Sequence, residues 1–172
     1  PFGLLTSVQE KSTGAVLTTR TYDLRDNLIS QTDANGNRTE YAYDSLNRVT
    51  STTVYDKENK AISQTLATYT DQYTDEHKNL YLKVSVTKKG DAADYITNYY
   101  YNGRGMLVKM GRVTAGGEIV REYEYDFLWN NISATGFDRA KTDITYDALG
   151  RKLSVTDPNG NTTSYAYDGL GN

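Results

Sequence analysis

Polar and apolar residues alternate with a period of two along much of the chain, and this pattern predicts β-strands. Leu153 and Val155 share one face of such a stretch, and Tyr165 and Tyr167 share one face of the stretch that follows. No segment predicts a helix with comparable strength. We therefore expect an all-β chain.

Turn signals separate these alternating stretches. Asp157 stands where a type I turn favours aspartate, a proline follows it, and Gly160 occupies the position that needs a positive φ. Asp33 and Gly36 repeat the same pattern earlier in the chain. Both sites predict tight hairpins, each made of a type I turn followed by a glycine bulge.

A second set of turns is expected directly after Tyr-Asp pairs. Asp147 precedes Gly150 by three residues, and Asn47 takes the glycine position after Asp44. Asparagine tolerates a positive φ better than other side chains. Trp129 occupies the equivalent position in another repeat, where a bulky side chain is unfavourable. We expect that turn to be rebuilt.

The Tyr-Asp pairs define an internal repeat, which indicates a repeat architecture. Tyr22 and Tyr43 are 21 residues apart, as are Tyr125 and Tyr146, and Tyr146 and Tyr167. The positions that recur are Tyr22, Asp23, Asp33, Gly36, Tyr41, Tyr43, Asp44, Tyr101, Tyr125, Asp126, Tyr146, Asp147, Gly150, Asp157, Gly160, Tyr165, Tyr167 and Asp168. We expect these positions to have a structural role.

The repeats are regular over residues 18–54 and 99–172 and irregular over 55–98. Longer strands are expected at 61–70 and 79–88, and a longer hairpin loop at 114–118. We expect residues 1–172 to form a single repeat segment, cut within its last repeat from a longer protein.

Composition explains how so polar a chain can fold. Hydrophobic residues make up only 37% of it, and the mean hydropathy is −0.68, but it contains 16 tyrosines. Tyrosine, threonine and valine fit a pleated, half-buried surface. Because a lone hairpin is marginally stable in water, we expect stacked antiparallel hairpins in an open, curved, twisted sheet.

Charge and cysteine content exclude several kinds of partner. The net charge is −3, the pI is about 5.2, and both signs are mixed along the chain. This pattern favours neither nucleic acid nor insertion into a membrane. The chain has no cysteine, which excludes disulfides and thiolate metal sites.

No catalytic, metal or cofactor site is predicted. The single histidine, His77, lies in a charged stretch and is expected to be solvated. The recurring aspartates follow the turns, so their repetition reflects structure rather than acid–base chemistry. The openings at Asp33 and Asp157 resemble calcium loops only faintly, because the glycine falls at the fourth position instead of the sixth.

Tyrosine rows also suit carbohydrate, because aromatic rings and Trp129 can stack on sugars. Packing of the tyrosines against neighbouring hairpins is the favoured interpretation. A glycan-binding or adhesion module therefore stays as the second hypothesis. A hydrolase is a third, and it would need a pocket with a perturbed titrating group.

The order of motifs in 146–168 resembles the Rhs/YD-repeat family. Tyr-Asp is followed by Leu-Gly-Arg, then Asp-x-x-Gly-Asn, then Tyr-x-Tyr-Asp. The resemblance covers 18–54 and 99–172 well. The family includes bacterial Rhs and wall-associated polymorphic toxins, shell components of insecticidal toxin complexes, and animal teneurins.

The resemblance implies a long β-sheet that spirals into a hollow shell. In the toxin members this shell encloses a C-terminal toxic domain, which a self-cleaving segment releases. Neither that segment nor a toxin domain is in this chain, so no catalytic residue is carried over. The implied role is a non-catalytic wall of a secreted or cell-surface bacterial protein, and the implied partner is the rest of the same polypeptide, with cell-surface glycans as the alternative.

Overall fold

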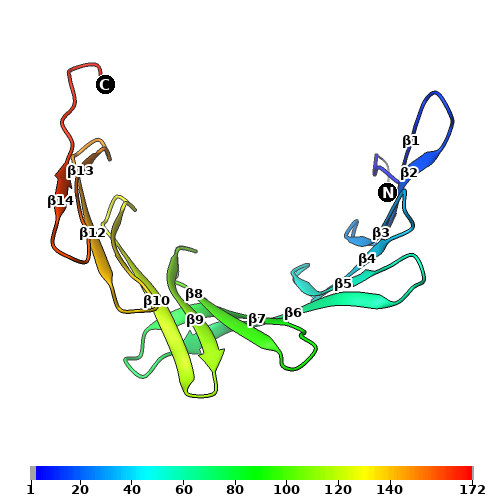
Figure 1. Cartoon of the computed structure of the whole chain (residues 1–172), viewed down its shortest axis with the longest axis horizontal. Helices are drawn as coiled ribbons and strands as arrows, with labels where there is room; N and C mark the ends of the chain where they lie inside the picture. The colour runs from blue at the N-terminus through cyan, green and yellow to red at the C-terminus, as the bar shows by residue number, and fades with distance from the viewer. Residues whose placement is uncertain (1–2, 172) are drawn as a thin grey trace. The chain divides into compact units, whose positions relative to one another are not determined.

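A computed structural model describes residues 3–171, and within that range the chain is entirely β-structure, without a helix (Figure 1). The 14 strands form one antiparallel sheet in which every strand pairs with its neighbours in sequence. The first and last strands do not pair with each other, so the sheet is open. The predicted fold class, stacked antiparallel hairpins in an open sheet, is confirmed.

The strands are short, and tight turns join most of them. Their bounds are β1 (Ser7–Gln9), β2 (Val16–Tyr22), β3 (Leu28–Asp33), β4 (Arg38–Tyr43), β5 (Val49–Tyr55), β6 (Ala61–Thr74), β7 (Leu80–Lys88), β8 (Tyr95–Tyr101), β9 (Leu107–Thr114), β10 (Gly117–Tyr125), β11 (Asn131–Thr135), β12 (Lys141–Tyr146), β13 (Lys152–Thr156) and β14 (Thr162–Ser164).

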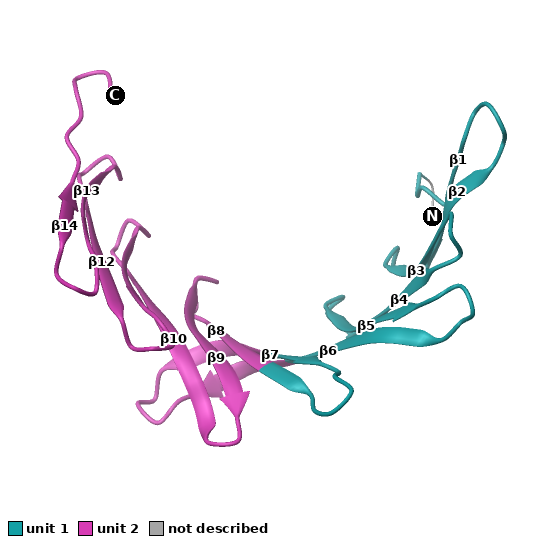
Figure 2. Ribbon diagram, viewed as in Figure 1, with its two compact units in different colours: residues 1–68, 85–96 teal, residues 69–84, 97–172 magenta. Residues whose placement is uncertain are grey.

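Two compact units divide the described residues (Figure 2). Unit 1 contains residues 3–68 and 85–96, and unit 2 contains 69–84 and 97–171. Tyr100 in unit 2 is the single apolar side chain that is buried among the described residues. Most strand residues are instead half-buried by their neighbours in the same sheet. The chain therefore forms a sheet without an extended core.

The two faces of the sheet in unit 2 differ in chemistry. Lys109, Glu122, Thr135 and Lys141 stand opposite one another across β9, β10, β11 and β12, and they belong to one face. We call this the polar face. Because side chains alternate along a strand, their sequence neighbours lie on the other side of the sheet.

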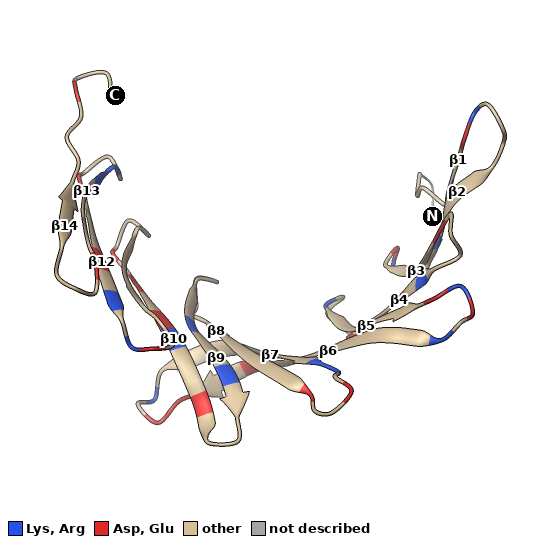
Figure 3. Cartoon of the chain, viewed as in Figure 1, with Lys and Arg blue, Asp and Glu red and all other residues tan. Residues whose placement is uncertain are grey.

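The second face of unit 2, which we call the apolar face, carries Met110, Tyr123, Ala134, Ile144 and Val155, together with Arg121 opposite Met110 and Thr142 opposite Ala134. Tyr123 pairs with Ala134, and Ile144 pairs with Val155. These side chains are half-buried rather than covered by a second layer. Across the described chain, residues of both charge signs are interspersed along strands and turns (Figure 3).

The hairpin expected at 114–118 differs from the prediction. Thr114 pairs directly with Gly117, and the Thr114 hydroxyl donates to the Gly117 carbonyl at 2.7 Å. The connection is thus a tight turn at 115–116, and the prediction of a longer loop is wrong. Tyr101 and Tyr125 are 24 residues apart, compared with 21 between the regularly spaced tyrosines, and the length of strands β9 and β10 accounts for this wider spacing.

Strand β6 also continues four residues beyond the expected segment 61–70, to Thr74. No helix in the described part of the chain is long and apolar enough to cross a membrane.

Candidate functional site

An aspartate side chain organises most of the repeated turns, as the turn after Tyr146 illustrates. The N–H of Asp147 donates to the Arg151 carbonyl at 2.9 Å, and the Gly150 N–H donates to the Asp147 carbonyl at 3.0 Å. Asp147 Oδ1 accepts the N–H groups of Leu149 and Arg151, each at 2.9 Å. Gly150 has a φ of 77°, as a glycine bulge requires.

The fifth residue of the turn completes the arrangement. Arg151 Nε donates to Asp147 Oδ2 at 2.7 Å, and at Asp157 the same role falls to Asn161 Nδ2 at 2.9 Å. The carboxylates that receive such a side-chain bond are those of Asp23, Asp33, Asp44, Asp75, Asp126, Asp147 and Asp157. Sequence reasoning missed this partner, although an asparagine or arginine four residues after the aspartate was visible as a signal.

These hydrogen bonds favour the charged form of each carboxyl. The Asn161 amide, followed by the Asn161 N–H, holds the pKa of Asp157 below its ordinary value. The same direction applies to the pKa of the other six aspartates, where bonds from the fifth residue are again the leading cause.

The turn that contains Trp129 keeps the common geometry, so the expectation that it is rebuilt is wrong. Trp129 has a φ of 74°, and its N–H donates to the Asp126 carbonyl at 3.1 Å. Asp126 holds the turn through the N–H groups of Leu128 and Asn130. The guanidinium of Arg104 lies 4.0 Å from the centre of the Trp129 ring. The carboxylate network and this stacking together offset the strain of a bulky residue at positive φ.

Trp129→Gly is expected to raise the free energy of unfolding by about 0.5–1 kcal/mol. The substitution removes a strain of about 1–2 kcal/mol at positive φ and loses an exposed stacking contact of about 0.5–1 kcal/mol. Urea unfolding followed by circular dichroism measures the change. Gly150→Ala, at the same position of the next turn, is the control and should lower stability; a destabilised Trp129→Gly would contradict the argument.

The tyrosines of the Tyr-Asp pairs hold together the open end of a hairpin, which is the end away from the turn that joins its two strands. The Tyr43 hydroxyl donates to the Leu28 carbonyl at 2.8 Å, where Tyr43 ends β4 and Leu28 begins β3. The same bond joins Tyr22 to Leu5, Tyr125 to Leu107, Tyr146 to Asn131 and Tyr167 to Lys152, at 2.9–3.0 Å. Each hairpin is thus closed by its turn at one end and by a tyrosine hydroxyl at the other.

These tyrosines are half-buried and do not form a fully buried row. Tyr41 and Tyr101 are also half-buried, whereas Tyr165 is 43% exposed. Burial raises the pKa of the Tyr43 and Tyr146 phenols, which keeps their protons available for donation.

Tyr43→Phe is expected to lower the free energy of unfolding by about 1 kcal/mol, because the Leu28 carbonyl loses a donor. Tyr165→Phe is the matched control, since its hydroxyl has no hydrogen-bond partner within residues 3–171. Urea unfolding of both variants measures the difference. Equal stabilities for the two variants would show that the bond contributes nothing.

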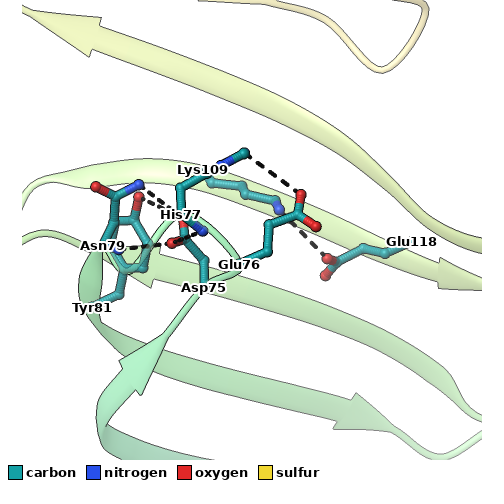
Figure 4. A network of polar contacts seen from close by, with 7 residues as sticks. All are labelled: Asp75, Glu76, His77, Asn79, Tyr81, Lys109 and Glu118. Carbon is teal, nitrogen blue, oxygen red and sulfur yellow. Dashed lines mark hydrogen bonds and ion pairs between the residues drawn. The ribbon is translucent and has the colours of Figure 1, made fainter.

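A polar cluster in unit 2 surrounds the one buried tyrosine, and sequence reasoning did not find it. The Tyr100 hydroxyl lies 3.1 Å from both carboxylate oxygens of Glu118, and Asn98 Nδ2 donates to Glu118 Oε1 at 2.8 Å. Lys109 Nζ lies 3.9 Å from the same carboxylate (Figure 4). Burial, and then the charge of Glu118, raise the pKa of Tyr100 far above its ordinary range.

Glycine at position 111 makes room for this cluster. A side-chain carbon on Gly111 would overlap the Glu118 carboxyl group. The ring of Tyr100 packs against Tyr73 and Tyr81, with ring centres 5.4 Å and 6.1 Å apart. The residues of this cluster come from strands β6 to β10, so no local sequence motif predicts it.

A shallow groove of about 350 Å³ lies beside this cluster, next to the turn at 75–79. Its lining includes Tyr81, whose hydroxyl lies 3.4 Å from Asp75 Oδ2, and Glu122. The His77 ring is exposed, with Nε2 3.6 Å from Glu76 Oε1 (Figure 4). Within residues 3–171, no three metal-ligating side chains converge.

Comparison with known proteins gives two results. Among solved structures, the crystal structure of TcdB2-TccC3-Cdc42 aligns with a TM-score of 0.47 and 18% identity over 88% of this chain and 10% of that chain. The crystal structure of TcdB2-TccC3 without its hypervariable C-terminal region aligns with a TM-score of 0.46 and 19% identity over 90% and 10%. The chain thus spans about 10% of the length of these chains. No curated protein sequence matches it.

The second result comes from a protein-family model described as RHS Repeat, which matches residues 22–54 and 146–172. These two segments contain the Tyr-Asp pairs, the aspartate-held turns and the tyrosine bonds described above. The intervening repeats lie outside the match, and among them Asn102 replaces the turn aspartate. The match identifies residues 22–54 and 146–172 as RHS repeats.

Proposed function

We propose that the chain is a non-catalytic segment of a shell wall in a secreted or cell-surface bacterial protein, and that the shell encloses a C-terminal part of the same polypeptide. One observation carries this proposal: unit 2 is a sheet with two chemically different faces, and residues 3–171 bury almost no core of their own. An apolar sheet face is stable in water only when another surface covers it. In this proposal the enclosed polypeptide provides that cover.

The faces of unit 2 suggest which side is internal. Met110, Ile144 and Val155 lie on the apolar face, whereas Lys109 and Glu122 lie on the polar face. An unfolded polypeptide exposes apolar side chains, which the apolar face can contact without strict specificity. We assign the apolar face to the inside of the shell and the polar face to the outside, where Tyr100, opposite Lys109, is covered by Tyr73 and Tyr81.

The fastening at both ends of each hairpin supports a structural role for the repeat positions. In the hairpin of β13 and β14, the Asp157 carboxylate accepts bonds from three donors at the turn, and the Tyr167 hydroxyl closes the other end. Such hairpins keep their register without a core beneath them, because the fastening lies within the sheet itself. The aspartates are therefore assigned to structure and not to acid–base catalysis.

Neighbouring residues on opposite faces provide the test. In the full-length parent protein, a thiol-reactive photo-crosslinker attached to Ile144→Cys lies on the apolar face. The same reagent attached to Asp143→Cys lies on the polar face, one residue away. This chain contributes no cysteine of its own. Crosslinks to the C-terminal region are expected from position 144 and not from position 143.

Limited proteolysis gives an independent readout in the same parent protein. The C-terminal region is expected to become more sensitive to protease when this segment is deleted. Equal sensitivity with and without the segment, or equal crosslinking from both positions, would overturn the proposal.

Carbohydrate binding has less support as a second function. Its expected signature is a group of free aromatic rings, but the tyrosines of the Tyr-Asp pairs use their hydroxyls to bind backbone carbonyls. Arg104 covers one face of the Trp129 ring. A glycan array with wild type and Tyr165→Ala tests this function, which requires a signal that the substitution removes.

A further inference from the structure

One edge of the sheet in unit 2 carries the three most exposed large apolar side chains of that unit. The turns at 102–106, 126–130, 147–151 and 168–171 all lie at this edge, because strands in sequence order turn alternately at the two ends. We call this edge the YD rim. Phe127 is 83% exposed, Leu149 78% and Leu170 90%, and Leu128 and Trp129 are about half exposed.

The turns of the YD rim touch one another and so form a continuous ridge. Arg104 stacks on Trp129 at 4.0 Å. A side-chain carbon on Gly150 would lie 3.4 Å from Asn130 Oδ1, and one on Gly171 would lie 3.6 Å from the Arg151 guanidinium. The apolar side chains therefore belong to one surface and not to isolated loops.

The opposite edge of unit 2 has a different character. Its turns at 115–116, 136–140 and 157–161 present small or polar residues such as Asp138 and Asn159. Phe137, the one large apolar residue there, is half-buried and lies between the guanidinium groups of Arg112 and Arg121. Exposed leucines are thus a property of one rim and not of turns in general.

Trp129 adds evidence that the YD rim is used. A residue held at positive φ keeps a large aromatic side chain at the surface, where glycine would be relaxed. Arg139 on the opposite edge has a φ of 65°, so the feature that distinguishes Trp129 is a large aromatic side chain at that turn position.

We propose that the YD rim of unit 2 docks against the same rim of a second copy of this chain, in a two-fold symmetric dimer. The charges of the rim permit contact between identical surfaces. Arg104 lies on an aromatic ring, and Arg151 is paired with Asp147. The Asp126 carboxylate is bound by Asn130. Stacking, an ion pair and a hydrogen bond within the rim thus engage Arg104, Arg151 and Asp126, respectively.

Periodicity also favours a second copy, and the exposed area limits how strongly it can bind. Leucines at successive turns recur every two strands, roughly 9.5 Å apart, and a copy of the rim has the same spacing. The exposed parts of the two aromatic residues and three leucines offer on the order of 500 Å², against about 800 Å² per partner in a standard interface. We expect a weak dimer with a dissociation constant in the micromolar range. A net charge of −3 disfavours the other apolar partner, an anionic lipid surface.

Sedimentation velocity over a dilution series tests the dimer in solution. Wild type is expected to pass from dimer to monomer on dilution, and Leu149→Ser with Leu170→Ser should weaken the association at least about 10-fold. Both side chains are exposed, so circular dichroism should show an unchanged fold. Leu153→Ser, on the apolar face of β13, is the matched control and should leave the association unchanged.

Single cysteines locate the interface, because the chain has none of its own. Leu128→Cys and Leu149→Cys, alone and mixed, are expected to give dimers with a short bismaleimide. Asn159→Cys on the opposite rim and Ile144→Cys on the apolar face should not.

A chain that stays monomeric at all concentrations would overturn the proposal, as would crosslinks from Ile144→Cys in place of the rim positions. Binding to phosphatidylglycerol vesicles that is lost in the double serine variant, without any dimer, would identify a lipid surface as the occupant. The inference does not depend on cargo enclosure, so a failure of either proposal leaves the other testable.

Discussion

Tyr100→Ala is expected to lower the free energy of unfolding by about 3–5 kcal/mol, the range for removing a buried aromatic side chain. Tyr100 is 3% exposed and packs against Tyr73 and Tyr81. Its removal leaves a cavity and also deprives the Glu118 carboxylate of a hydrogen-bond donor. Urea unfolding measured by circular dichroism gives the change.

Tyr95→Ala is the matched control for this substitution, since Tyr95 lies in the same strand and is 72% exposed. We expect the control to cost less than about 1 kcal/mol. Tyr100→Phe isolates the hydroxyl and should cost about 1.5–3 kcal/mol, the range for a hydrogen bond to a charged group. Similar losses for the two alanine variants would show that the cluster around Tyr100 does not stabilise unit 2.

Acidification is expected to lower the free energy of unfolding of the chain as the pH falls below about 4, because seven turn aspartates become protonated. The folded chain holds the pKa of each of them below 3.8, the ordinary value. Their contribution to stability is therefore fully present above that pH. It is lost as the pH falls through the lower, folded pKa values.

A pH titration of urea stability measures this effect. Asp157→Asn should flatten the acid limb of the curve, because the amide can still accept the turn N–H groups through Oδ1 but no longer titrates. Asp91→Asn removes a carboxylate outside the repeated turns and should leave the acid limb as in wild type. A stability that does not change between pH 5 and pH 2 would contradict the role given to the carboxylates.

The local architecture could be read from the sequence because its causes are local. Asp157 and Gly160 define a turn through bonds within five residues, and the alternation of Leu153 and Val155 defines a strand. A spacing of 21 residues between Tyr146 and Tyr167 then predicts that the unit repeats. Each of these inferences needs only steric and hydrogen-bonding rules for short segments.

The prediction that the turn containing Trp129 is rebuilt was wrong, because hydrogen bonding and stacking at that turn outweigh the cost of a positive φ. Positive φ is unfavourable for tryptophan, but the Asp126 carboxylate and the Arg104 guanidinium keep the common turn. Arg104 belongs to the preceding Tyr-Asp turn of unit 2, so its contribution was not visible at position 129. The loop expected at 114–118 failed in a similar way, since pairing of β9 with β10 extends to Gly117.

The sequence by itself determined the all-β class, the hairpin repeat and the chemistry of the aspartate turns. Only the tertiary structure decided what each tyrosine hydroxyl binds, that Tyr100 and Glu118 form a buried cluster, and that exposed leucines gather on one rim. The physical reason is distance along the chain: Tyr100 and Glu118 are 18 residues apart, and strand register alone brings them together. Turn chemistry acts within a few residues, whereas the faces and rims of a sheet exist only once its strands have paired.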